Sequence, residues 1–355
     1  MMSEKVFQRL RAGCVIPAHP LALTTEKKLD ERHQRALTRY YVAAGAGGLA
    51  VGVHTTQFAI HDPRVGLYGP VLELAAETAK RAVEPGEGAA PVMIAGLVGP
   101  TSQAVREAEL ARQMGYHLGL LSLTALKGQS TDELLDHVRQ VAEVIEVMGF
   151  YLQPALSEMV LPWQFWERFC EIPNVRAIKI APFNRYQSLD VLEAVARSGR
   201  SAEIALYTGN DDNILVDLLT RHIFCVGGEP VCVPMAGGLL GQWACWTKRA
   251  VEHLQTVKAL RAAEAPVPQD LLALAGQLTL ANRAIFDPGH DFAGCIPGIL
   301  YVLQQQRLVD QVVSLNPHER LSPGQIDEID RIIRDYPHLT DDEFVQANRD
   351  AWLAP

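Results

Sequence analysis

One lysine within an apolar segment is the residue of this chain best suited to nucleophilic chemistry. It is Lys179, in the segment Val-Arg-Ala-Ile-Lys-Ile-Ala at residues 175–181. In a strand, Ala177, Lys179 and Ala181 share one face, because side chains alternate. Two small neighbours leave room for the lysine stem and little water for its ammonium group. Such desolvation lowers a lysine pKa and makes the amine a nucleophile toward a carbonyl carbon. The alternative is an edge strand whose lysine reaches solvent, which is the commoner situation.

Lys179 lies in the sixth of eight short apolar segments that alternate with helical patterns. This alternation predicts an α/β fold, a (β/α)8 TIM barrel over residues 1–234, followed by a C-terminal helical region over residues 235–355 that packs on the barrel. No GxGxxG motif follows the first strand, which argues against an open dinucleotide-binding sheet. The predicted strands are residues 13–18, 48–53, 92–97, 118–123, 150–153, 176–181, 204–207 and 223–226.

The carboxyl ends of the predicted strands carry further candidates for the site, because reacting groups of such barrels lie there. Lys179 would attack a ketone, a tyrosine would move protons, and hydroxyl groups with backbone amides would hold a carboxylate. The candidates come after the second strand, within the fifth and after the seventh: His54, Thr55, Thr56, Tyr151 and Gly209.

Two of the polar residues near the barrel mouth have two interpretations each. His54 could act as acid or base or bind the substrate, or it could simply be hydrogen-bonded in a loop. Arg185, after the lysine strand, could clamp a distal carboxylate or phosphate, or make a surface ion pair. Asp211 and Asp212 are expected to shape the loop after the seventh strand or to cap the next helix.

Several segments, in this order and spacing, resemble the dihydrodipicolinate synthase / N-acetylneuraminate lyase family of class I, Schiff-base aldolases. Residues 43–56 are similar to its glycine-rich segment that ends in GTT, and residues 148–154 to its YNxP motif. Residues 172–179 are similar to its lysine strand, and residues 208–211 to its "tG-D" segment.

The resemblance implies roles for the matching residues. Lys179 would form the Schiff base and Tyr151 would be the proton-relay phenol. Thr55 and Thr56 would bind the carboxylate of a pyruvate-like substrate, with Thr55 also in the relay. No dissociable cofactor is expected, because the imine on the lysine is itself the electron sink. The family's assemblies imply a homodimer or homotetramer.

The chain also departs from the family's pattern. The family's GTTGE is here His-Thr-Thr-Gln-Phe at residues 54–58, so both glycines and the glutamate are replaced. The family's tyrosine cluster after the fourth strand is missing, and Leu156 stands where synthases carry an arginine for a dicarboxylic substrate. These departures argue against dihydrodipicolinate synthesis. The expected reaction is instead aldol cleavage or dehydration of a pyruvate-type 2-oxo acid or a 2-keto-3-deoxy sugar acid.

Composition indicates a cytoplasmic protein that binds neither nucleic acid nor membrane. The chain of 355 residues is 48% hydrophobic and 21% charged, with a formal charge of -9, so it has no basic excess for nucleic acid or lipid headgroups. Its six cysteines form no CxxC pair, which is typical of reduced thiols. The amino-terminal segment has no signal-peptide core, and no apolar run is long enough to span a bilayer.

Two other function classes remain open at this point. The barrel could bind a 2-oxo acid through Lys179, Thr55 and Thr56 without turnover, as a sensor. It could instead be a metal-dependent lyase or hydrolase with scattered ligands, although the sequence has no HExxH motif. The candidate ligands for a metal would be His54, His61, Asp62, His290 and Asp291.

Overall fold

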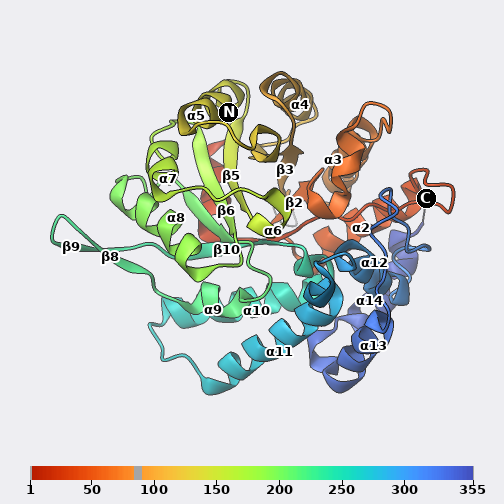
Figure 1. Ribbon diagram of the computed structural model, residues 1–355. Helices are drawn as coiled ribbons and strands as arrows, with labels where there is room; N and C mark the ends of the chain where they lie inside the picture. Colours follow the sequence, from red (N-terminus) through yellow and green to blue (C-terminus); the bar gives the residue numbers. More distant parts are fainter. Residues whose placement is uncertain (1, 84–89, 355) are drawn as a thin grey trace.

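The computed structural model describes residues 2–83 and 90–354, and it shows a barrel of eight parallel strands surrounded by helices (Figure 1). A parallel bridge between Ala18 and Ala50 joins the first and last strands of the sheet, so the sheet closes on itself. The predicted (β/α)8 barrel is confirmed. The barrel strands, in their order around it, are β1 (Val15–Pro17), β10 (Met235–Leu240), β7 (Ala205–Thr208), β6 (Val175–Ala181), β5 (Glu146–Leu152), β4 (Leu118–Leu121), β3 (Val92–Leu97) and β2 (Gly48–Val51).

The prediction of the eighth barrel strand at residues 223–226 is wrong. That segment, β8 (Ile223–Val226), pairs antiparallel with β9 (Glu229–Cys232) in a hairpin that extends away from the barrel (Figure 1). The eighth barrel strand is β10, so the barrel continues beyond the predicted boundary at residue 234. β10 contains Gly237, where a Cβ atom would lie 2.2 Å from the carbonyl oxygen of Cys14. Its close contact with β1 requires a glycine, and glycine weakens the sequence signal of a strand.

The helices begin and end at the residues that favour such ends. At α5, Ser130 and Glu133 form the predicted capping box, and Gly45 ends α2 in the left-handed conformation that glycine adopts without strain. The helices before β10 are α1 (Glu4–Ala12), α2 (Glu31–Ala44), α3 (Tyr68–Ala82), α4 (Thr101–Gln113), α5 (Thr131–Ala142), α6 (Pro154–Ser157), α7 (Trp163–Phe169), α8 (Arg185–Arg197) and α9 (Ile214–Leu219). After β10 come α10 (Thr247–Ala262), α11 (Gln269–Phe286), α12 (Cys295–Gln305), α13 (Gln325–Asp335) and α14 (Asp342–Trp352).

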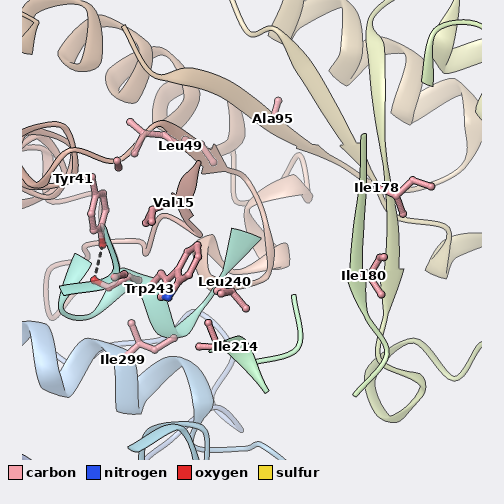
Figure 2. Packing of buried hydrophobic residues seen from close by; sticks show 14 of the residues in the cluster. Val15, Tyr41, Leu49, Ala95, Ile178, Ile180, Ile214, Leu240, Trp243 and Ile299 are labelled. Carbon is pink, nitrogen blue, oxygen red and sulfur yellow. Dashed lines mark hydrogen bonds between the residues drawn. The ribbon is translucent and has the colours of Figure 1, made fainter. Parts of the chain in front are cut away.

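The strands bury both of their faces, and this sorts the side chains of β6 into two layers. Ile178 and Ile180 belong to the large apolar cluster between the barrel and its helices, and Figure 2 labels both among its members. Ala177 and Ala181 belong to a second cluster inside the barrel, together with apolar side chains from the other strands. Lys179 lies between these two alanines and therefore points into the barrel, as the alternation predicts.

The C-terminal helices pack beside the barrel and are tied to it by buried polar contacts (Figure 1). Helix α14 packs against α2, where the Tyr40 hydroxyl donates to Asp341 at 2.7 Å. The segment between α12 and α13 reaches the barrel mouth, where the Leu315 N–H donates to the Gln57 side chain at 2.6 Å. None of the helices described at residues 2–83 and 90–354 is long and apolar enough to cross a membrane.

Candidate active site

Lys179 lies inside the barrel, with almost no contact with solvent. Its residue is 8% exposed, and its neighbours across the sheet are Phe150 on β5 and Tyr207 on β7. The Nζ atom lies 4.5 Å from the centre of the Phe150 ring, a distance at which a cation is attracted to the ring face. Burial lowers the pKa of Lys179, while electrostatic interaction with Asp211, and then with Cys295, acts in the opposite direction. The amine therefore loses its proton more readily than a lysine in water.

Asp211 shares this buried site with Lys179. It follows β7 and is 5% exposed, and one of its carboxylate oxygens accepts a hydrogen bond of 2.8 Å from the Gln242 N–H. Burial raises the pKa of Asp211, while this hydrogen bond and the charge of Lys179 act in the opposite direction. The sequence predicted only a loop-shaping or capping role for Asp211. The signal for a place in the site was the family's "tG-D" segment, whose aspartate it matches.

A small cavity of about 50 Å³ connects these two side chains, with room for roughly three or four water molecules. The C-terminal region closes one side of it with Phe286, Phe292 and Cys295, which sequence analysis did not place at the site. The barrel supplies the remaining lining, which is Ala18, Val53, His54, Thr55, Phe150, Leu152, Gln153, Leu156, Lys179, Ala181, Phe183, Gly209, Asp211 and Gly241.

Gly209 lines the cavity, and this position needs a glycine because any Cβ atom here would clash with the lysine side chain. A Cβ atom at this position would lie 2.6 Å from Cε of Lys179 and 2.6 Å from Cβ of Ala181. Real Cβ atoms essentially never approach other heavy atoms so closely. Gly209 thus lies beside the lysine and lines the cavity, and its predicted role in substrate binding stays a prediction.

The two threonines after β2 have different surroundings. Thr55 lines the cavity, but its hydroxyl donates to the Ala18 carbonyl at 2.9 Å. The Thr56 hydroxyl donates to the His19 carbonyl at 2.6 Å and accepts from the N–H groups of Gly52 and Val53. Thr56 is fully buried and fastens the end of β2, and it is not among the described residues that line the cavity.

His54 stands where the lysine cavity meets a second, larger one. It lines both of them, and its ring lies 5.7 Å from that of Phe58. Burial, and then the positive charge of Lys179, lower the pKa of His54 to about 4. The imidazole is therefore neutral at pH 7 and can accept a hydrogen bond.

Tyr151 does not lie beside Lys179, against the prediction. It is paired with Ile180 across the sheet and belongs, like Ile180, to the outer apolar cluster. Its hydroxyl donates to the Leu161 carbonyl at 3.3 Å and accepts from the Leu161 N–H at 3.2 Å, and its ring packs on Trp166. Burial raises the pKa of Tyr151 to about 12. The position beside the lysine is taken by Phe150, which has no proton to move.

Arg185 makes an ion pair rather than lining the cavity. It is the first residue of α8 and is paired with Asp217, a buried carboxylate that also accepts from Thr208 and Asn210. Within the described chain, neither Arg185 nor any other arginine lines the lysine cavity or the one beside it. The prediction that Arg185 clamps a substrate anion is not supported by this arrangement.

The histidines and aspartates weighed as metal ligands are dispersed. His61 is bonded to Glu107 and to the Gly52 carbonyl, and His290 is bonded to Asp287. Among the residues described, one cluster offers three ligand atoms within 4.8 Å of one another, and it contains none of the five weighed. That cluster is Asp30, His33 and Asp310.

The protein is a closed (β/α)8 barrel, and it carries a buried lysine in the barrel interior near the carboxyl ends of the strands. These two features place it in the class of (β/α)8 barrels with a lysine in the lumen. The profile of the Dihydrodipicolinate synthetase family matches residues 12–229. The chain belongs to this family.

Known relatives agree with this assignment. A 4-hydroxy-tetrahydrodipicolinate synthase of Thiobacillus denitrificans is 25% identical over 198 residues, which are 56% of this chain and 62% of that protein. The chain thus matches about three fifths of the length of such relatives. The crystal structure of a chloride-inhibited dihydrodipicolinate synthase from Acinetobacter baumannii, complexed with pyruvate, has a TM-score of 0.71 at 17% identity, covering 91% of this chain and 98% of that one. N-acetylneuraminate lyase from Fusobacterium nucleatum has a TM-score of 0.68 at 15% identity, covering 92% and 99%. These two likenesses show the fold.

Proposed function

We propose that this protein is a Schiff-base-forming lyase that acts on a pyruvate-type 2-oxo acid or a 2-keto-3-deoxy sugar acid through Lys179. The observation that carries the proposal is a lysine buried inside the barrel at the strand ends, with a pKa lowered by burial and a cavity beside its amine. Membership of a family that contains lyases supports this reaction type.

Asp211 supplies the proton transfers that the predicted tyrosine cannot. Through a water molecule in the cavity that both side chains line, its carboxylate takes a proton from the Lys179 ammonium. The neutral amine then adds to the C2 carbonyl carbon of the substrate. The resulting carbinolamine loses its hydroxyl group as water after the same proton returns from Asp211. The products are a protonated imine and one water molecule, and Asp211 is again ionised. Its raised pKa suits a group that both accepts and returns a proton near neutral pH.

The imine then accepts electrons from the bond that breaks. In cleavage, the C4 hydroxyl proton passes through water to the ionised Asp211 as the C3–C4 bond breaks, which gives an aldehyde and an enamine; the enamine is then protonated at C3 and hydrolysed from the lysine. In dehydration, Asp211 takes a proton from C3 and returns it to the C4 hydroxyl group, which leaves as water. Neutral His54, at the junction of the two cavities, is placed to accept a hydrogen bond from a C4 hydroxyl. We assign the substrate carboxylate to the N–H groups of His54 and Thr55, the two residues of the short helix His54–Thr56 that line the lysine cavity. No dissociable cofactor is needed for these steps.

Borohydride trapping tests the imine directly. The protein is incubated with pyruvate and reduced, and the intact mass and the modified peptide are then read. We expect a stable adduct on Lys179 and none in Lys179→Ala, with an unchanged circular dichroism spectrum. Lys127→Ala, which removes an exposed lysine, is the matched control and should trap pyruvate normally. An adduct on another lysine, or normal turnover in Lys179→Ala, would refute the proposal.

A binding protein without turnover is the second candidate function. It is favoured by one observation, the absence of the Tyr151 hydroxyl from the lysine cavity. Trapping separates the two candidates when it is combined with product analysis. An adduct that forms with a 2-keto-3-deoxy acid but never releases an aldehyde or a dehydrated acid would establish the sensor and exclude the lyase.

A further inference from the structure

We propose that Gln57 and Glu319 form a specificity-determining pair that selects a substrate whose distal carbon chain carries neutral hydroxyl groups and rejects one that ends in a carboxylate. This inference rests on the proposed function, since it concerns the part of a 2-oxo acid that lies beyond the imine. Glu319 comes from the segment between α12 and α13, outside the region that matches the family profile.

The pair faces a second cavity that adjoins the lysine cavity. Its volume is about 530 Å³, ten times that of the space beside Lys179. His54, Leu152 and Leu156 line both cavities, so a chain attached to the imine carbon can continue from one into the other. The other lining residues are Gln57, Phe58, Ala59, Val98, Gly99, Ser122, Thr124, Ala125, Asn316 and Glu319.

Gln57 lines this cavity and carries a buried donor without a partner in the described chain. The residue is 2% exposed, and its side-chain oxygen accepts the Leu315 N–H at 2.6 Å, which fixes the orientation of the amide. Its Nε2 atom is buried and has no hydrogen-bond partner among the described residues. A buried donor without a partner is costly, and such groups are rare unless a ligand or water satisfies them.

Glu319 lines the same cavity and carries an acceptor without a partner in the described chain. The residue is half-buried, and its Oε2 atom is fully enclosed without a hydrogen-bond partner among the described residues. Burial raises the pKa of this carboxyl group. Its segment is held at the barrel mouth by two backbone contacts of Leu315, whose N–H donates to Gln57 and whose carbonyl accepts from Lys27 at 3.0 Å.

A donor and an acceptor on one cavity together match a hydroxyl group, which can accept from the first and donate to the second. Ser122 and Thr124 add hydroxyl groups whose oxygens lie 3.1 Å apart. A distal carboxylate would meet the opposite conditions, because Glu319 is acidic and no lysine or arginine is among the described residues that line this cavity. Charge and hydrogen bonding thus favour the same substrate class.

The experiment compares three six-carbon 2-oxo acids as probes. The first is 2-keto-3-deoxygluconate, which ends in an alcohol, and the second is 2-keto-3-deoxyglucarate, which ends in a carboxylate, each as a mixture of C4 epimers. The third is 2-oxohexanoate, which has no hydroxyl groups. The concentration that gives half-maximal borohydride-trapped adduct on Lys179 is measured for each, with pyruvate as the short reference. The variants are Glu319→Leu and, as the matched control, Glu158→Gln, which removes an exposed carboxylate that lines neither cavity.

In the unaltered protein we expect the half-maximal trapping concentration of the alcohol-ended acid to be roughly tenfold or more below those of the other two six-carbon acids. A difference of this size corresponds to one hydrogen bond to a charged group. Glu319→Leu should reduce this preference to about threefold or less and leave pyruvate trapping unchanged, whereas Glu158→Gln should keep it. Absence of the preference, or its survival in Glu319→Leu, would overturn the inference. If pyruvate itself forms no adduct, the proposed imine fails. The same preference is then measured by equilibrium dialysis of the three acids, where its presence would support the pair and its absence would overturn it.

Glu319→Leu also provides a second readout. Because the variant removes an enclosed carboxylate without a partner, we expect its melting temperature to be equal to or higher than that of the unaltered protein. A lower melting temperature together with lost preference would indicate that Glu319 is structural and would refute its role as a substrate contact.

Discussion

Replacement of Gly209 by alanine would test whether the position of Lys179 limits the chemistry. The added Cβ would lie 2.6 Å from Cε of the lysine and 3.1 Å from its Cγ. Carbon atoms in contact are about 3.5 Å apart, so the lysine stem must move by roughly 1 Å. A displacement of this size in a reacting group costs about a hundredfold in rate. We therefore expect imine formation to slow by about two orders of magnitude.

The assay is the rate of adduct formation with saturating pyruvate, followed by quenching with borohydride at timed intervals. Overpacking should also cost about 1–3 kcal/mol of stability, so the rate is measured well below the melting temperature of the variant. Gly276→Ala is the matched control, because a Cβ at Gly276 in α11 meets nothing within 4 Å, and its rate should be unchanged. A Gly209→Ala protein that forms the adduct at the normal rate would show that the lysine site tolerates displacement, and the geometric reasoning would be refuted.

Two further predictions concern the acid–base groups. Asp211→Asn should slow imine formation by about a hundredfold or more, as loss of acid–base help does. It should also move the rising limb of the pH–rate profile to lower pH, because the charge of Asp211 raises the pKa of Lys179 and its removal lets that pKa fall further. The profile is measured by trapping with borohydride at timed intervals between pH 5 and 10. A rising limb that stays in place or moves to higher pH would contradict the electrostatic coupling of the two residues. Tyr151→Phe should leave the trapping rate within about twofold and reduce the free energy of unfolding by about 1 kcal/mol, because it removes only the hydrogen bonds to Leu161. A large loss of rate with full stability would restore the tyrosine to the reaction.

The lysine strand could be predicted from the sequence because its signal is local. Two alanines and two isoleucines alternate around Lys179, and burial on both sides of β6 gives each pair its own layer. The last barrel strand could not be found in the same way. β10 is rich in glycine, since Gly237 must lie against the backbone of Cys14, whereas the apolar β8 looked like a strand and is one, in a hairpin outside the barrel.

The position of Tyr151 depends on the register in which β5 pairs with β6. The motif that contains Tyr151 was recognised in the sequence, but a shift of one residue in this register places Phe150 beside Lys179 instead. Pairing of β5 with β6 is irregular between Val147 and Met148, and beyond this point Phe150, not Tyr151, is opposite Lys179. A shift by one residue turns every side chain of a strand to the other face. The motif gives the order of residues along the chain. The face of β5 that carries each side chain relative to Lys179 depends on pairing with β6, and a local sequence pattern does not reveal this pairing.

The contact between Gln57 and the C-terminal region explains one departure from the family's GTTGE segment. Gln57 stands where the family has its second glycine, and its φ of 68° is in the left-handed region that glycine adopts freely. The chain thus has a backbone conformation that suits glycine while it carries a larger side chain, at a cost of about 1–3 kcal/mol. The strain is offset by what the side chain does, since its oxygen binds the N–H of Leu315 and so holds the segment that carries Glu319 over the second cavity. The glutamine that replaces the second glycine of the family's GTTGE segment therefore attaches the C-terminal segment to the barrel mouth.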